Sequence, residues 1–158
     1  MDSFESRELR NLANPRFNLS LTVTDTMAGG AKAVSSGDEL AKRVCELGKK
    51  LGLEVREQFK VARRLWGAER RIDVILKDPK SLKTLGIECK YQGGGGTAEE
   101  KVPATIQDIK AWPIDGIVVF SGDGFTTNMR SFLISTGKAV ELEDLEPWLR
   151  LYSGLPLN

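Results

Sequence analysis

A chain of 158 residues, 41% hydrophobic and 28% charged, has the composition of one soluble globular domain, so fibrous and disordered classes are excluded. Its longest apolar run, at residues 117–120, is too short to span a bilayer, and the first residues lack a signal-peptide pattern, so no membrane segment is expected. Two cysteines and no histidine argue against a disulfide framework and a zinc cluster, and a reducing, cytoplasmic location is expected.

The net charge is only +1, but cationic residues concentrate in one part of the chain. Residues 40–71 contain ten Lys or Arg against four Asp or Glu, whereas residues 141–146 are mainly acidic. A locally basic surface can hold phosphates even on a nearly neutral protein. A solvated helix face explains such a run equally well, so the charge pattern alone does not identify a partner.

Residues 1–35 are polar and interrupted by Asn-Pro and Gly-Gly pairs, which predicts an irregular arm with a short helix at 4–12 and a strand at 19–23. This arm is a candidate for assembly or specificity contacts. The main domain is expected to span residues 36–158. It begins with a helix, because Ser36 and Glu39 fit a capping box and apolar residues then recur at helical spacing up to Gly52.

Three strands are predicted next, at residues 55–61, 71–76 and 86–91. A turn at 66–69 and a loop that starts at Asp78 would join them, so the three strands should form an antiparallel meander. Val55, Phe59 and Val61 occupy odd positions and are expected to share one face of the first strand.

The second half of the chain predicts helices on both sides of further strands. A helix is expected at 98–112, with Pro103 in its first turn if the helix starts near Glu100. The apolar run at 116–121 is typical of a strand covered on both faces. A helix at 127–135, a short strand at 138–142 and a helix at 145–152 follow. The order αβββαβ, followed by αβα, predicts an α/β fold with a mixed central β-sheet flanked by helices.

Charged residues interrupt the second and third strands. Glu88 and Lys90 alternate with apolar residues and therefore share one face of the third strand. On the second strand, Ile72 and Val74 are expected to point away from Asp73. Because antiparallel neighbours lie side by side, Asp73 can approach Glu88 and Lys90. Charges on strands that pack into a core are costly unless something compensates them, so this cluster points to a function.

Two neighbouring carboxylates repel each other, and a divalent cation relieves that repulsion. With oxygen ligands alone the expected ion is Mg²⁺, with Mn²⁺ as a substitute, bound by Asp73, Glu88 and the backbone carbonyl of Cys89. Lys90 would hold or help to deprotonate a water and offset negative charge at a phosphorus atom. Such a site hydrolyses phosphodiesters. The alternative is a structural salt-bridge network on an exposed sheet face.

An acidic residue two positions before a lysine is by itself a weak signal. Only the pair at positions 88 and 90 lies in an apolar strand that follows a second apolar strand carrying an Asp. The same spacing recurs in a turn and on a helix surface, at Asp78/Lys80, Glu99/Lys101 and Asp108/Lys110.

Asp73 and the Glu88-Cys89-Lys90 triplet, within this order of elements over residues 37–142, resemble the PD-(D/E)XK nuclease superfamily of restriction-endonuclease-like fold. The segment YQGGGGTAEEKVP is similar to the one that follows the catalytic strand in several restriction-type members. The resemblance implies that Asp73 and Glu88 bind the metal, that Lys90 positions the water and that Gln92 is an active-site neighbour.

The sequence departs from the superfamily pattern at two points. Ile72 stands where the motif has a nominal Pro, a position that the superfamily keeps loosely. Many members also have a Glu near the start of the first helix that faces the metal, and Glu39 is the nearest match. Its separation from Gly52 is longer than usual, so Glu39 can instead be only the capping carboxylate, with Glu46 in reserve.

The resemblance implies a Mg²⁺-dependent DNA endonuclease, restriction-like or homing-type, that leaves 5′-phosphate and 3′-hydroxyl ends. Cutting both strands needs two sites, so a homodimer or higher symmetric homo-oligomer is expected. A junction-resolving or repair nuclease, a non-catalytic nucleic-acid-binding module and an interaction protein without a nucleic-acid role are the alternatives. The candidate contacts to the DNA backbone are Arg63, Arg64, Arg70, Arg71 and Lys101.

Overall fold

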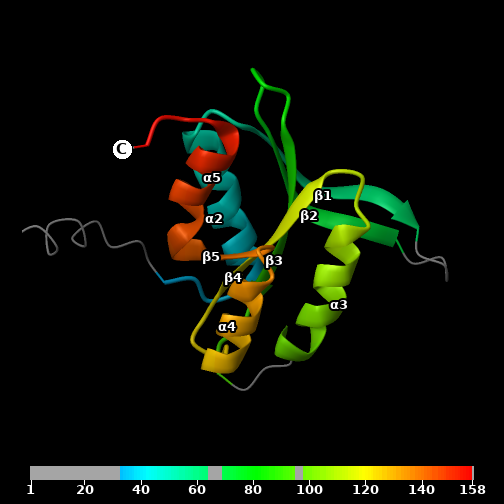
Figure 1. The fold of residues 1–158 in the computed structure, drawn as a ribbon, viewed down its shortest axis with the longest axis vertical. Coiled ribbons are helices and arrows are strands. Elements are labelled where there is room, and N and C mark those ends of the chain that lie inside the picture. Colours follow the sequence, from blue (N-terminus) through cyan, green and yellow to red (C-terminus); the bar gives the residue numbers. More distant parts are fainter. Residues whose placement is uncertain (1–32, 64–68, 95–97, 158) are drawn as a thin grey trace, which may run out of the picture. The chain divides into compact units, whose positions relative to one another are not determined.

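The computed structural model describes residues 33–63, 69–94 and 98–157 (Figure 1). Contacts gather Val34–Asn158 into one compact unit. The helix predicted at 4–12, the strand predicted at 19–23 and almost all of the predicted arm lie outside the described residues, so the domain boundary at residue 36 stays a prediction. Among the described residues, no helix is long and apolar enough to cross a membrane.

The described helices and strands follow the predicted order. They are α2 (Gly37–Lys50), β1 (Glu54–Arg63), β2 (Glu69–Lys77), β3 (Thr84–Tyr91), α3 (Ala98–Lys110), β4 (Asp115–Ser121), α4 (Thr127–Ser135), β5 (Ala139–Glu141), a 3-10 turn at Leu142–Asp144 and α5 (Leu145–Ser153). The strands form one sheet in the order β1-β2-β3-β4-β5. The first three strands are antiparallel neighbours, whereas β4 runs parallel to both β3 and β5. The predicted α/β fold with a mixed sheet is therefore confirmed.

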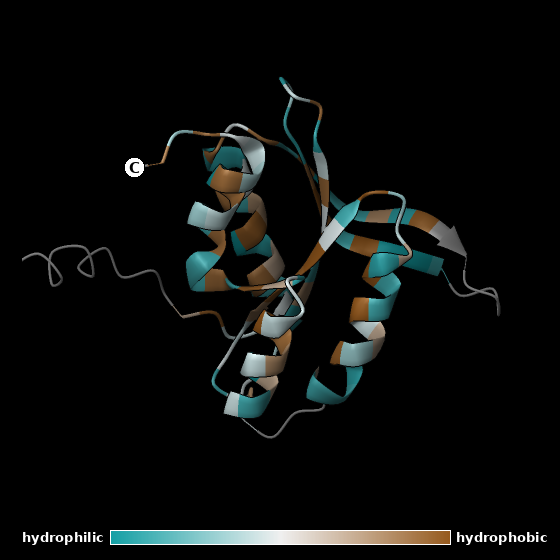
Figure 2. Ribbon diagram, in the orientation of Figure 1, coloured by the Kyte–Doolittle hydropathy of each residue, from teal (hydrophilic) through white to brown (hydrophobic). Residues whose placement is uncertain are grey.

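Helices cover both faces of the sheet, with α2 and α5 on one side and α3 and α4 on the other (Figure 1). We call these sides the α2 face and the α3 face. Apolar and polar residues alternate around the helices, as Figure 2 shows. The apolar side chains form one buried cluster on each face. Strand β4 contributes to both clusters, because its residues from 116 to 121 are all buried.

Helix α2 begins where the capping signal predicts. The Ser36 hydroxyl accepts a hydrogen bond from the Glu39 backbone N–H at 3.1 Å, which satisfies one of the free N–H groups of the first turn. Lys49 and Lys50 lie in the last turn, where positive charge interacts favourably with the helix dipole. Leu40 is fully buried against the sheet. These local features fix the helix that covers the strands carrying the charged cluster.

Strand β1 contains an irregularity that alternation did not predict. Gln58 has a φ of 49°, a left-handed conformation that is unusual for a residue other than glycine. As a result, Val55 packs into the cluster on the α2 face, whereas Val61 packs into the cluster on the α3 face. The prediction that Val55, Phe59 and Val61 share one face was wrong, because a strand keeps strict alternation only while its backbone stays extended.

Strand β2 switches faces at the same level of the sheet. Ile72 belongs to the buried cluster on the α3 face, whereas Val74 belongs to the cluster on the α2 face. The expectation that these two side chains point the same way was therefore also wrong. Asp73 lies between them, beside Gln58 of the neighbouring strand. The irregularity in both strands is centred on the predicted metal ligand.

Pro103 lies deeper in its helix than the sequence suggested. Helix α3 starts at Ala98, so Pro103 occupies the second turn and not the first. Its side chain is exposed, so the ring meets solvent and not the sheet. The helix therefore accepts the loss of one backbone donor at this position.

A buried glutamine ties the end of β3 to two other segments. Gln92 is 6% exposed, and its side-chain amide donates to the Gly124 carbonyl at 2.9 Å and accepts from the Glu99 N–H at 2.9 Å. The Gln92 carbonyl accepts from the Gly124 N–H at 2.8 Å. Space here is tight, since a Cβ on Gly124 would lie 1.5 Å from the Gly93 carbonyl oxygen. The chain after β3 is therefore held against the loop between β4 and α4.

We predict that Gly124→Ala destabilises the protein by about 1–3 kcal/mol, because the added methyl group forces two backbone segments apart. Gly37→Ala is the matched control, since a Cβ there meets nothing within 4 Å and the residue lies in the first turn of α2. Chemical denaturation measures both variants. Equal stability of Gly124→Ala and the parent chain would contradict the close approach.

Candidate active site

The ladder between β2 and β3 ends beside the charged cluster. In the described part of these strands, the pairing runs from Lys77 and Thr84 to Val74 and Ile87. Beyond the last pair, the Asp73 side chain accepts a hydrogen bond through Oδ2 from the Cys89 backbone N–H at 2.9 Å. A side-chain carboxylate thus takes the place of a strand carbonyl, which lets the two strands separate without leaving this N–H group unsatisfied.

A second hydrogen bond holds the Asp73 carboxylate from the other side. Gln58 Nε2 donates to Asp73 Oδ1 at 3.2 Å. The left-handed backbone of Gln58 is therefore associated with a contact to the predicted metal ligand. Strained backbone conformations concentrate at functional sites, where the surrounding structure maintains them. Asp73 is positioned by both neighbouring strands.

Glu88 and Lys90 lie on the same face of β3, as the alternation predicted. Lys90 Nζ lies 2.8 Å from Glu88 Oε1, and the two side chains are 20% and 19% exposed, respectively. The intervening residue points to the opposite face, where the Cys89 side chain packs against the buried cluster. Burial raises the pKa of the Cys89 thiol above its usual value, so its sulfur is neutral. The charged pair thus stands on one face and the inert thiol on the other.

Two carboxylates share this small region, and the pKa of Glu88 reflects it. Burial is the largest cause that raises the Glu88 pKa above its usual value, and the nearby Asp73 carboxylate is the second. Lys90 acts in the opposite direction but does not cancel these effects. Asp108, on α3, adds a smaller increase. A carboxyl group with a raised pKa next to a second carboxylate is typical of functional sites.

A cavity of about 350 Å³ opens between β2, β3 and α3 at this position. Asp73 is not part of its wall, whereas Glu88 and Lys90 are. Arg70, Arg71 and Lys101 also line it, as do the acidic residues Glu100 and Asp108. The wall therefore carries four cationic side chains and three acidic ones.

Asp108 lies at the site but was not among the site residues predicted from the sequence. Its carboxylate Oδ1 lies 3.1 Å from Arg70 Nη2, so α3 holds a β2 arginine at the cavity. Lys101, Thr105 and Asp108 follow each other at spacings of four and three residues, which places them on one helix face. That spacing was visible in the sequence, but only the fold shows that this face meets Glu88.

Glu39 accepts hydrogen bonds from the Ser35 N–H at 2.9 Å and the Ser35 hydroxyl at 2.6 Å. This agrees with the capping alternative for Glu39. Among the described residues, no group of three or more His, Cys, Asp or Glu side chains has an arrangement that could hold a metal. Whether Glu39 or Glu46 reaches a metal stays a prediction. Gln92 makes the buried contacts described above and links structural segments.

The candidate DNA-binding residues divide into three groups. Arg64 and the side chain of Arg63 lie outside the described residues. Arg70 and Arg71 line the cavity and pair with acidic neighbours, Arg71 with Glu69 at 2.8 Å. Lys101 lines the cavity and is exposed. The structure thus brings three of the five predicted residues to the cavity.

We predict that Glu88→Gln stabilises the metal-free protein at neutral pH. The pKa of Glu88 is raised in the folded state, so its contribution to stability is present at low pH and is lost as the pH rises through that pKa. Glutamine resembles the protonated form, so the difference between variant and parent should vanish below the ordinary value of 4.5. Urea denaturation at low and neutral pH with EDTA measures it.

Glu143→Gln is the control for this experiment, because Glu143 is exposed on the 3-10 turn and its replacement should change stability little. A Glu88→Gln variant that is less stable than the parent at neutral pH would contradict the unfavourable environment of this carboxylate.

The chain matches the model of the PD-(D/E)XK nuclease superfamily domain over residues 31–152. A search of curated proteins finds no significant match. Similar solved structures include the protein of unknown function AF1548, at 17% identity and a TM-score of 0.45, over 64% of this chain and 55% of that one. A protein of unknown function from Silicibacter pomeroyi, SPO1766, matches at 20% identity and a TM-score of 0.42, over 65% and 83%.

A repair endonuclease from Pyrococcus abyssi matches at 11% identity and a TM-score of 0.39, over 70% of this chain and 50% of that one. The chain thus spans about half the length of AF1548 and of the repair endonuclease. The superfamily match covers most of the chain and contains both strands that carry Asp73, Glu88 and Lys90. The chain belongs to the PD-(D/E)XK nuclease superfamily.

Proposed function

We propose that the protein is a metal-dependent DNA endonuclease, restriction-like or homing-type, that hydrolyses phosphodiester bonds. The observation that carries this proposal is the meeting of Asp73 and Glu88, with Lys90 beside them, where β2 and β3 separate. A salt-bridge network on an exposed face would be well solvated. Here Glu88 and Lys90 are about four-fifths buried and line a cavity, which favours a functional site.

The residues present fit a Mg²⁺ ion. The superfamily is typically metal-dependent. Mg²⁺ binds through one or two carboxylates and keeps several waters, so it does not need a third acidic side chain. Asp73 and Glu88 supply two carboxylates. Burial first and repulsion by Asp73 second raise the pKa of Glu88, and a divalent cation would remove that repulsion. The backbone carbonyl of Cys89, between Glu88 and Lys90, is the further oxygen proposed, and Mn²⁺ is the expected substitute.

A bound cation would supply charge neutralisation at the phosphate and a more acidic water. The chain's own residues account for the remaining steps. Asp73 is held in place by Gln58 and by the Cys89 N–H, so it is oriented before any ligand binds. Lys90 Nζ is within hydrogen-bond distance of Glu88 and is placed to orient a water or to offset negative charge on the phosphoryl oxygens.

Phosphate contacts are assigned to the basic side of the cavity. Arg70 is held by Asp108. The Arg71 side chain is more than half exposed, and Lys101 is exposed on α3. Such residues bind the DNA backbone and set its position, but they do not read sequence. Cleavage of both strands requires two active sites, so the proposal includes a homodimer or a higher symmetric assembly.

We predict metal-dependent cleavage of DNA that falls by about 100-fold or more in both Asp73→Asn and Lys90→Ala. Supercoiled, linear and junction DNA are incubated with Mg²⁺, Mn²⁺ or EDTA, which also distinguishes a junction-resolving enzyme. Lys110→Ala is the matched lysine control, because Lys110 also follows an acidic residue by two positions but is exposed at the end of α3. Absence of cutting with every metal and substrate, despite binding, would refute catalysis.

Metal binding can be measured without activity. At a Mg²⁺ concentration about tenfold above its dissociation constant, the parent protein should gain about 1.4 kcal/mol of stability, because only the folded state binds the ion. Asp73→Asn should lose most of this gain, whereas Asp144→Asn, at an exposed position far along the chain, should keep it. Denaturation with and without Mg²⁺ gives the result. An equal gain in all three proteins would place the ion elsewhere.

A further inference from the structure

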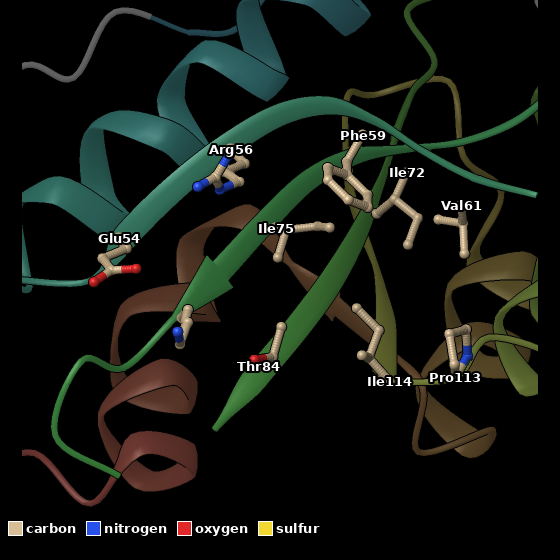
Figure 3. A pocket seen from close by; sticks show the side chains of 10 residues that line it. Glu54, Arg56, Phe59, Val61, Ile72, Ile75, Thr84, Pro113 and Ile114 are labelled. Atoms are coloured by element: carbon tan, nitrogen blue, oxygen red, sulfur yellow. The ribbon is translucent and has the colours of Figure 1, made fainter. Parts of the chain in front are cut away.

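A second, apolar groove lies on the α3 face of the sheet, separate from the cavity that Glu88 lines. Its volume is about 360 Å³, and its floor is formed by β1 and β2 (Figure 3). Phe59, Ile72 and Ile75 line it, with Ile114 from the segment between α3 and β4. Phe59 is 45% exposed, a large value for an aromatic side chain beside other apolar residues. Grouped apolar surface of this kind marks interaction sites.

The irregularity at Gln58 creates this surface. Before it, the even-numbered residues Glu54 and Arg56 line the groove, whereas after it the odd-numbered residues Phe59 and Val61 do. An undisturbed strand would have placed Phe59 and Val61 on the opposite side from Glu54 and Arg56. The same backbone change that lets Gln58 contact Asp73 therefore turns apolar side chains outward.

The groove carries opposite charges on its two strands, Glu54 on β1 and Lys77 on β2. Glu54 pairs with Lys77 across β1 and β2, and Phe59 pairs with Ile72. Consider two copies that face each other across a two-fold axis parallel to these strands. This axis would place β1 of each copy opposite β2 of the other copy. Glu54 would then face the partner's Lys77, and the exposed Phe59 would lie over the partner's groove, whose floor includes the fully buried Ile72. An isologous interface requires this kind of self-complementary patch.

We propose that this groove is the surface through which two copies of the chain pair face to face. The inference rests on the homodimer included in the proposed function and identifies its interface. A net charge of +1 means that two copies repel each other little. A nucleic-acid backbone is a poor occupant of the groove, because most of its lining is apolar and its charged residues, Arg56, Lys77 and Glu54, include an acidic one. Pairing here would bring both copies of β2, which carries Asp73, to one interface.

Sedimentation velocity of the full chain across a wide concentration range tests the proposal. The parent should form dimers, and Phe59→Asp should raise the dimer dissociation constant by about tenfold or more, because a charge would be buried at the centre of the patch. Phe132→Asp is the matched control: Phe132 is 43% exposed, as Phe59 is 45% exposed, but it lies on α4 and should leave the constant unchanged. Circular dichroism confirms that each variant is folded.

A charge exchange gives a second readout. Glu54→Lys and Lys77→Glu should each weaken the dimer, and the double variant should recover part of the loss, because opposite charges meet again across the axis. A monomeric parent, or a dimer that Phe59→Asp leaves intact, would overturn the proposed surface. Metal-dependent cleavage by a monomer would overturn this interface but leave the nuclease proposal standing. A dimer that depends on Phe59 but does not cleave DNA would support the interface and overturn the nuclease proposal.

Discussion

One hydrogen bond determines the geometry on which the site depends: the Asp73 carboxylate accepts from the Cys89 backbone N–H at the point where the β2–β3 ladder ends. Two adjacent strands can separate inside a protein only if their freed backbone groups find other partners. Asp73 supplies that partner from its side chain. Asp73 therefore lies near Glu88, whose pKa is raised above its usual value by burial and, second, by the Asp73 carboxylate.

The fold tolerates this cost because the surrounding structure is well packed. Strand β4 is buried along residues 116–121 and anchors β3 by parallel pairing from Leu85 to Tyr91. Helix α2 covers one face, and α3 supplies the Asp108 that holds Arg70 at the other. A largely buried ion pair contributes little net stability compared with apolar packing, so the Glu88–Lys90 pair in the cavity wall is consistent with function, not with a role in stability.

Strand alternation and capping predicted most of the architecture. The predicted cap at Ser36 and the shared face of Glu88 and Lys90 are in the structure, because each depends on neighbouring residues in the chain. The left-handed conformation of Gln58 was not predictable, since its side chain contacts Asp73 on another strand and the local sequence does not show that contact. Asp108 was missed for the same reason. Its helical spacing was visible, but its proximity to Glu88 depends on how α3 packs on the sheet.

The proposed function requires that Asp73 and Glu88 hold one divalent cation between β2 and β3. Crystals soaked in Mn²⁺ and measured for anomalous scattering would locate this ion. A single strong peak is expected about 2.1 Å from an oxygen of each carboxylate, the distance typical of a small octahedral cation. A peak elsewhere, or none beside these two carboxylates at saturating Mn²⁺, would contradict it.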